Sequence, residues 1–144
     1  MPATPDQLIG TWRLVSWDRI EDGDKRIPAL GPGADGLITY TTDGFMFGML
    51  MAPNRKQFAG TDPFGGTVEE CRQAMSTALA YCGRYRVDGD CVVHTVEMSM
   101  YPNWVGTEQR RAYRFDGDRV VLRTVQPIVR NGVSSVAELV WRRT

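Results

Sequence analysis

The sequence predicts an all-β domain: an eight-stranded antiparallel up-and-down β-barrel with one helix inserted between the third and fourth strands. Three observations predict it. Runs rich in β-branched and aromatic residues recur along the chain, Asp-Gly pairs separate alternating runs, and one segment alone has helical periodicity. Consecutive hairpins favour an up-and-down barrel over a sandwich, because closing the barrel removes both edges of the sheet.

Length and composition narrow the class of protein. The 144 residues suit one domain covering residues 1–144, and seventeen basic residues balance seventeen acidic ones, so neither nucleic acid nor an anionic membrane is an expected partner. Residues 1–10 lack the pattern of a signal peptide, and no apolar run has the roughly 18 residues of a membrane span. Three cysteines without ligand spacing and a single histidine favour a reduced cytoplasmic protein with no metal or cofactor.

The expected strands follow the turn signals. Asp-Gly between alternating runs is a strong hairpin signal, because a type I′ turn needs positive φ at both central residues. Such pairs stand at 43–44, 88–89 and 116–117. The expected strands and hairpins cover residues 8–20, 37–50, 81–100, 108–126 and 134–143, which makes eight strands.

Residues 67–82 break the β rhythm and predict the helix. Thr67 and Glu70 have the spacing of a capping box, in which each side chain bonds the other residue's backbone N–H. Apolar residues then recur at helical spacing, at Val68, Cys71, Met75, Leu79 and Cys82. We expect a helix over residues 68–81, either as a lid or as a plug for one end of the barrel.

A two-residue turn at 88–89 assigns the faces of the second hairpin. The solvated face carries Arg84, Arg86 and Glu97. The inner face then carries Tyr81, Tyr85, Val87, Val92, His94, Val96, Met98 and Met100.

The third hairpin has four arginines on one face, which identifies the outside. Its inner face carries Gln109, Arg111, Tyr113, Phe115, Val120, Leu122, Thr124 and Gln126. In the first hairpin the aromatic face with Tyr40, Phe47 and Met49 is preferred as the inner one. A bulge in any hairpin would slip the register by one residue and reverse these faces.

The predicted interior mixes aromatic, methionine and polar side chains, which a wet pocket accommodates more readily than a closed core. His94 is either a proton shuttle for a ligand or a satisfied core histidine. Arg111 is either an anchor for a carboxylate, enolate or carbonyl oxygen, or an arginine stacked on a tyrosine. The candidate catalytic residues are His94, Arg111 and Tyr85. The candidate ligand-binding residues are Tyr40, Phe47, Met49, Met98, Trp104, Gln109, Tyr113 and Thr124.

Several stretches resemble a known family. Gly10-Thr11-Trp12 is similar to the Gly-x-Trp signature of lipocalins, and "LVWRR" looks like their closing strand, where an arginine packs over that tryptophan. With "GLITYTTDGFMFGML", "AYCGRYRV" and "VVHTVEMSMYPNWVGTEQRRAYRF", the chain resembles a bacterial and fungal lipocalin-like domain family. The resemblance implies a calycin-like barrel with a pocket for a small molecule. The helix between the third and fourth strands departs from secreted lipocalins.

Two functions follow as hypotheses. The first is a barrel that binds a small, largely apolar or aromatic molecule in its central cavity. The alternative is a cofactor-independent cyclase or isomerase of secondary metabolism, since some members of the resembled family look like such enzymes. In that version Arg111 and a tyrosine polarise a carbonyl and His94 moves a proton. An interaction module is a weaker third class, although an arginine-rich outer face could pair two subunits as a homodimer.

Overall fold

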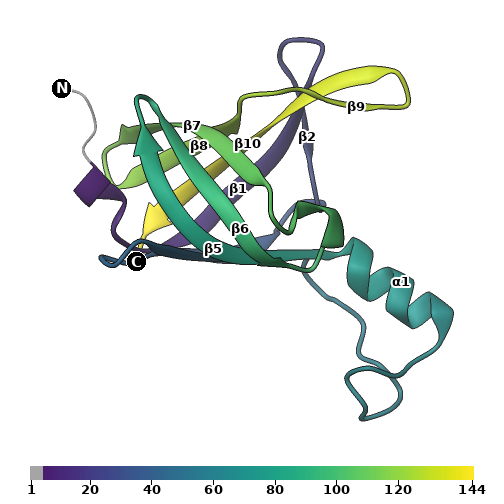
Figure 1. Cartoon of the computed structure of the whole chain (residues 1–144). Helices are drawn as coiled ribbons and strands as arrows, with labels where there is room; N and C mark the ends of the chain where they lie inside the picture. Colours follow the sequence, from purple (N-terminus) through teal and green to yellow (C-terminus); the bar gives the residue numbers. More distant parts are fainter. Residues whose placement is uncertain (1–4) are drawn as a thin grey trace.

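The structure, a computed structural model, describes residues 5–144, so the first four residues of the N-terminal stretch lie outside it. Ten strands form one antiparallel sheet (Figure 1). The elements are η1 (Pro5–Leu8), β1 (Gly10–Glu21), β2 (Lys25–Pro28), β3 (Asp35–Tyr40), β4 (Phe45–Met51), α1 (Val68–Ser76), β5 (Ala78–Asp88), β6 (Cys91–Ser99), η2 (Pro102–Trp104), β7 (Glu108–Asp116), β8 (Arg119–Thr124), β9 (Ile128–Arg130) and β10 (Val133–Arg143).

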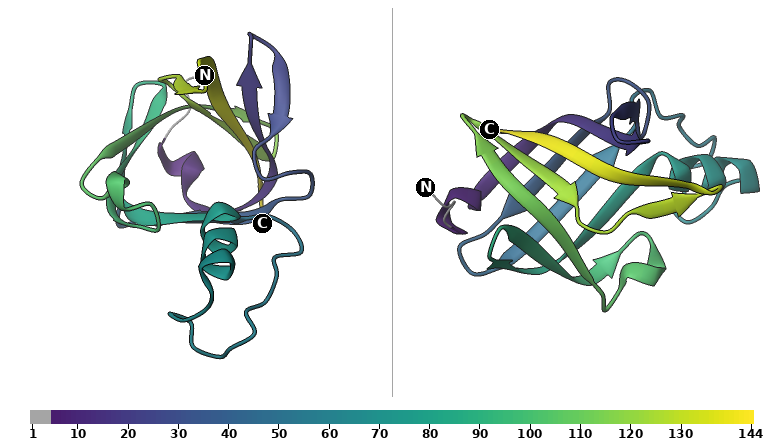
Figure 2. Two further views of the ribbon diagram at one scale, coloured as in Figure 1. Left: turned by 90° about the vertical axis from the view of Figure 1, so that its right-hand side faces the viewer. Right: turned by 90° about the horizontal axis from the view of Figure 1, so that it is seen from above.

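The first and last long strands close the sheet into a barrel. β1 pairs with β10 from Trp12↔Arg143 to Glu21↔Ser135. The remaining order is β1-β3-β4-β5-β6-β7-β8-β10, with the short strands β2 and β9 added beside β1 and β10. The view along the barrel axis shows the closed ring (Figure 2). The predicted eight-stranded barrel is confirmed, and α1 lies between its third and fourth strands, as expected.

One end of the barrel is plugged by the N-terminal segment. Leu8 and Trp12 are buried, and the Trp12 indole N–H donates to the Leu8 carbonyl at 2.8 Å. The Arg143 guanidinium lies 4.1 Å from the centre of the Trp12 ring and donates to the Ile9 carbonyl at 2.9 Å. The expected contact between the first and last strands is confirmed.

The second and third hairpins keep the predicted faces although their registers differ. Tyr85 pairs with His94 and Tyr113 with Leu122, each two residues further along than a turn centred on Asp-Gly predicts. A shift of two residues moves no side chain to the opposite face. His94 and Arg111 therefore face the interior, as predicted.

The first hairpin reverses the predicted face of β4. The Thr41 N–H donates to the Phe45 carbonyl at 2.8 Å, and Gly44 has φ +91°, which fits a three-residue turn. That turn is one residue longer than expected, so the register slips by one. Tyr40 stays inside, but Phe47 and Met49 are 53% and 45% exposed. The prediction that these two side chains face inward is wrong.

A bulge in β6 turns Met98 outward. Gly83 pairs with Val96, but the preceding Cys82 pairs with Met98, so β6 holds an additional residue between them. A Cβ on Gly83 would lie 1.9 Å from the Thr95 carbonyl oxygen, so only glycine permits this approach. Met98 is 63% exposed, and its predicted inward position is wrong. Met100, expected beside it, is also exposed.

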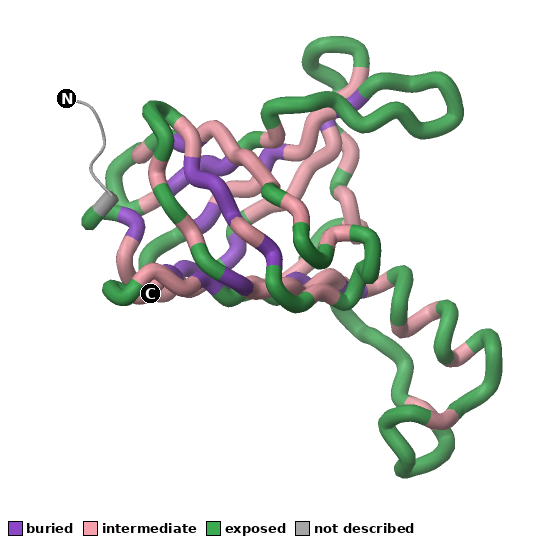
Figure 3. The backbone as a smooth tube through the Cα atoms, viewed as in Figure 1, coloured by how far each residue is buried: buried purple, intermediate pink, exposed green. Residues whose placement is uncertain are grey.

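Helix α1 begins as predicted but ends early. Thr67 and Glu70 form the expected capping box. The helix ends at Ser76 because the chain then pairs with β4, beginning with Ala78 opposite Met51, and sheet pairing overrides the helical spacing of the following residues. No described helix residue is buried, and the helix with its preceding loop projects from the barrel (Figure 3). This position supports neither a lid nor a plug.

Candidate functional site

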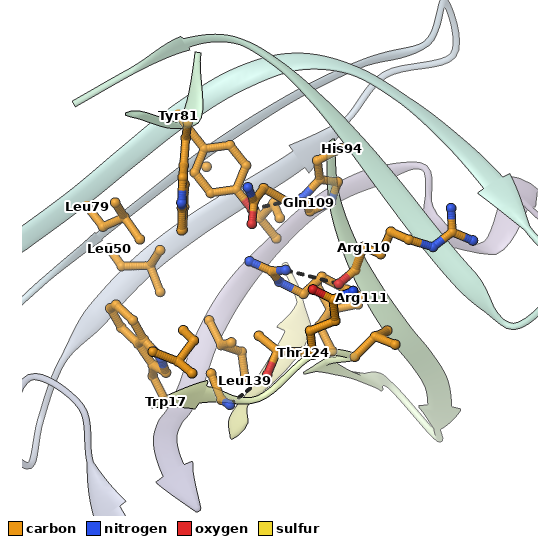
Figure 4. Close-up of a pocket in the computed structure, with 18 of the residues that line it drawn as sticks. Trp17, Leu50, Leu79, Tyr81, His94, Gln109, Arg110, Arg111, Thr124 and Leu139 are labelled. Carbon is orange, nitrogen blue, oxygen red and sulfur yellow. Dashed lines mark hydrogen bonds between the residues drawn. The ribbon is translucent and has the colours of Figure 1, made fainter. Parts of the chain in front are cut away.

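The barrel encloses a cavity of about 400 Å³ (Figure 4). Its wall is largely apolar and aromatic, which suits a small organic ligand. The apolar lining includes Trp17, Leu50, Leu79, Trp104, Leu122, Leu139 and Trp141, and the polar lining includes Tyr81, His94, Gln109, Arg111 and Thr124.

His94 is held by two tyrosines, one at each ring nitrogen. The Tyr40 hydroxyl lies 2.7 Å from Nε2, and the Tyr81 hydroxyl lies 2.8 Å from Nδ1. His94 is 1% exposed, and the three side chains come from β3, β5 and β6. The hydrogen-bonded chain runs from the buried core at Tyr40 to the cavity wall at Tyr81 and His94.

Burial and a neighbouring charge make this chain neutral. Burial, with the positive charge of Arg111, lowers the pKa of His94 to about 3. Burial also raises the pKa of Tyr40 and Tyr81, and for Tyr81 the Arg111 guanidinium opposes the increase. At neutral pH, His94 and both tyrosines are therefore uncharged.

Arg111 is the one lining arginine that points into the cavity in Figure 4, where Arg110 points away. Its Nη1 donates to the Arg110 carbonyl at 3.0 Å. Within residues 5–144 no carboxylate forms an ion pair with Arg111, whereas Arg110 pairs with Asp88 at 2.6 Å. The guanidinium also interacts with the Tyr81 hydroxyl, and it places an unbalanced positive charge and further N–H donors at the cavity wall.

Three predicted ligand-binding residues line the cavity. Trp104, in η2, packs edge-on against Tyr81 with ring centres 5.3 Å apart. The Gln109 side-chain N–H donates to the Thr107 hydroxyl at 3.0 Å. The amide oxygen of Gln109 can therefore accept a hydrogen bond from another donor. The Thr124 hydroxyl oxygen accepts the Ala137 N–H at 2.9 Å and keeps its own proton for another acceptor.

Three tyrosines that were candidate site residues face inward but are not part of this lining. Tyr85 donates its hydroxyl to the Thr41 carbonyl at 2.8 Å and packs edge-on against Tyr40. Tyr40 is 1% exposed and reaches the cavity only through His94. Tyr113 packs against Phe115 in the core. Their direct contact with a ligand remains a prediction, and their positions give it no support.

The remaining candidates lie on the outside of the barrel. Phe47, Met49 and Met98 line a shallow apolar groove of about 520 Å³ across the outer face of β3, β4, β5 and β6. The reversed face of β4 and the bulge in β6 place them there. They cannot contact a molecule inside the barrel.

Comparison with known proteins assigns the chain to a family. Residues 9–144 match the model of a lipocalin-like domain. The protein belongs to the lipocalin-like domain family. This lipocalin-like chain is 40% identical over 106 residues, 68% of its length, to the 4′-hydroxy-3′-methoxypropiophenone carrier protein ppsC of Aspergillus oryzae, of which it covers 96%. The chain is also similar to a crystal structure of a mutant of the fluorescent protein UnaG, with 13% identity and a TM-score of 0.40 over 98% of this chain and 99% of that one.

Sequence reasoning missed several lining residues of this lipocalin-like barrel. Tyr81 lies on the predicted inner face with His94 but is not among the predicted site residues. Trp17 faces the lumen together with Trp12 because a bulge between Leu14 and Ser16 changes the alternation of β1. Regular alternation gives no sign of that bulge. Leu139 and Trp141 lie on β10 at alternate positions, a signal that could have identified them.

No helix between residues 5 and 144 is long and apolar enough to cross a membrane. In the same range no three His, Cys, Asp or Glu side chains gather where they could hold a metal ion.

Proposed function

We propose that the protein is a carrier that binds a small aromatic molecule inside its barrel. The observation that carries the proposal is the cavity of about 400 Å³, walled by aromatic and aliphatic side chains around a few polar groups. The 40% identical relative is named as a carrier of an aromatic ketone, which supports the same class of cargo here.

The lining fits a planar ring better than a long chain. Trp17, Trp104 and Trp141 line the cavity. Aromatic side chains favour offset or edge-on packing against another ring. Tyr81 and Trp104 pack edge-on beside His94 and present aromatic ring surfaces against which a ligand ring can pack. We therefore infer that the ring of the cargo lies against Trp104 and Tyr81.

An enzyme that cyclises or isomerises the same molecule is less well supported. A general acid or base works best with a pKa near the working pH, but the pKa of His94 is about 3 and both ring nitrogens are already hydrogen-bonded. Tyr85 is bonded to a backbone carbonyl. Of the three predicted catalytic residues, only Arg111 remains placed to polarise a carbonyl. The catalytic roles of His94, Arg111 and Tyr85 remain a prediction.

Titration of 4′-hydroxy-3′-methoxypropiophenone, followed by tryptophan fluorescence and calorimetry, tests the carrier. We expect saturable binding that quenches the lining tryptophans. Leu79→Trp fills the cavity and should abolish binding, while Met49→Asp alters only the outer groove and should leave affinity unchanged. Unchanged affinity in Leu79→Trp would contradict a cargo in the lumen. Recovery of the compound unaltered after incubation supports a carrier, and a new product would support the enzyme.

The proposed carrier works in the cytoplasm. Cys71, Cys82 and Cys91 are all free thiols, as expected of a reducing compartment. A homodimer remains a prediction that sizing chromatography can check.

A further inference from the structure

We propose that Tyr81 and Arg111 select the cargo by an oxygen that only accepts hydrogen bonds, a ketone or phenolate oxygen. This inference rests on the proposed function, because it names the chemical class that the same cavity takes. It follows from the direction of the hydrogen bonds through Tyr40, His94 and Tyr81.

The buried end of the chain sets that direction. Among residues 5–144, the Tyr40 hydroxyl has His94 Nε2 as its hydrogen-bond partner and no other. A neutral imidazole has one N–H donor and one nitrogen acceptor. If Nε2 carried the proton, the Tyr40 proton would be buried without an acceptor, which is costly. Tyr40 therefore donates to Nε2, and the imidazole proton is on Nδ1.

The other end of the chain then becomes a donor to the cavity. Nδ1–H donates to the Tyr81 oxygen over 2.8 Å. Because Nδ1 is already protonated, the Tyr81 hydroxyl cannot donate its own proton to it. No other acceptor for the Tyr81 proton is found in the described part of the chain. Because Tyr81 lines the cavity, its O–H is available to a ligand there. Tyr40, a buried tyrosine outside the cavity lining, thus determines that Tyr81 presents a hydrogen-bond donor to a ligand.

Arg111 adds a second donor and the only unbalanced charge among the described lining residues. Of the other charged lining residues, Glu108 pairs with Arg86 at 3.2 Å, and Arg110 pairs with Asp88, both at exposed positions. The neighbouring titratable groups His94 and Tyr81 are neutral at pH 7. A ligand oxygen with partial or full negative charge is therefore favoured over a ligand cation.

The tautomer can be read directly because the chain has one histidine. A ¹⁵N spectrum of imidazole nitrogens, recorded at pH 7 on protein without a histidine tag, contains signals from His94 alone. We expect a protonated Nδ1 and an unprotonated Nε2. A protonated Nε2 would overturn the proposed direction of the chain.

Affinities for three compounds of one shape test the selection. Propiophenone presents a ketone oxygen, propylbenzene lacks it, and 1-phenylpropylamine replaces it with a cation. We expect the ketone to bind about tenfold more tightly than the hydrocarbon and the amine to bind most weakly. Arg111→Met and Tyr81→Phe should each remove most of the preference for the ketone, measured as the ratio of the affinities for propiophenone and propylbenzene.

Tyr40→Phe tests Tyr40 as a positioning residue. Without the Tyr40 proton, His94 can accept from Tyr81, so the ketone preference should fall although Tyr40 does not line the cavity. Loss of affinity for ketone and hydrocarbon alike would indicate a merely structural role and overturn this step. If the wild type binds all three compounds equally, the selection is wrong while the carrier stands. If it binds none, both are contradicted.

Discussion

The Tyr40 hydroxyl lies 2.7 Å from Nε2 of His94, and both residues are 1% exposed. The bond connects β3 to β6, which are not neighbours in the sheet, across the interior of the barrel. It therefore stabilises the packing of opposite walls and also orients the only histidine. The same buried hydrogen bond therefore contributes to the stability of the barrel and to the orientation of His94 at the cavity wall.

Removing the Tyr40 hydroxyl should destabilise the barrel. Tyr40→Phe leaves Nε2 of the buried His94 without a hydrogen-bond partner, which costs about 1–3 kcal/mol. Tyr101→Phe is the matched control, because the Tyr101 hydroxyl contacts Asn103 at an exposed site. In urea unfolding, this control should lower the free energy of unfolding by less than about 0.5 kcal/mol. Equal effects of the two substitutions would contradict the role of the buried bond.

The free energy of unfolding should fall as the pH falls from 7 to 5.5. The folded-state pKa of His94 is about 3, against 6.5 without the fold, so between these values the unfolded chain binds a proton that the folded protein does not. The expected loss is about 1 kcal/mol, and stability is fully regained above pH 6.5. Arginine partners lower the pKa of Asp35, Asp88 and Glu108. Protonation of these carboxylates therefore reduces the free energy of unfolding only at lower pH.

The variant His94→Gln tests whether His94 causes this dependence of the free energy of unfolding on pH, the pH slope. Denaturant midpoints of the variant should hardly change between pH 7 and 5.5. The variant is expected to be less stable at pH 7, but only the slope is diagnostic. A slope equal to that of the wild type would show that another group carries the pH dependence.

Gly83→Ala should disrupt the bulge that turns Met98 outward. The new Cβ would lie 1.9 Å from the Thr95 carbonyl oxygen, so the strands must separate, at a cost of about 3 kcal/mol or more. Gly60→Ala is the control, since no atom lies within 4 Å of its Cβ. Thermal unfolding of both variants measures the difference. A wild-type melting temperature for Gly83→Ala would contradict the described register.

The contact of Arg143 with Trp12 should hold the closed end of the barrel. Arg143→Met removes the cation above the ring and the donor to the Ile9 carbonyl, a loss of about 1–2 kcal/mol. The adjacent Arg142 makes one exposed ion pair with Asp118, so Arg142→Met should cost less than about 0.5 kcal/mol. Chemical unfolding that ranks the two variants in the opposite order would contradict this assignment.

Local signals in the sequence predict the barrel and much of its inner face. The hairpins after Asp88 and Asp116 keep their faces because their registers shift by two residues. The face of β4 depends on whether the turn before Phe45 has two or three residues, which Asp-Gly does not decide. The bulge opposite Gly83 depends on contact between two strands.

The sequence also does not predict that Tyr40 bonds His94, and the cause is the separation of the two residues. Tyr40 is 54 positions earlier in the chain and lies on a strand that does not pair with β6. No alternation within either hairpin indicates that the two side chains meet. The predicted extension of the helix beyond Ser76 is wrong, because helical spacing and strand pairing compete over the same residues.

A crystal structure of the protein with 4′-hydroxy-3′-methoxypropiophenone tests the central claim most directly. We predict the ring inside the barrel against Trp104, with a ketone or phenolate oxygen about 3 Å from the Tyr81 hydroxyl and facing the Arg111 guanidinium. A compound seated only in the outer groove beside Phe47, or one whose oxygens point away from Tyr81 and Arg111, would contradict the account.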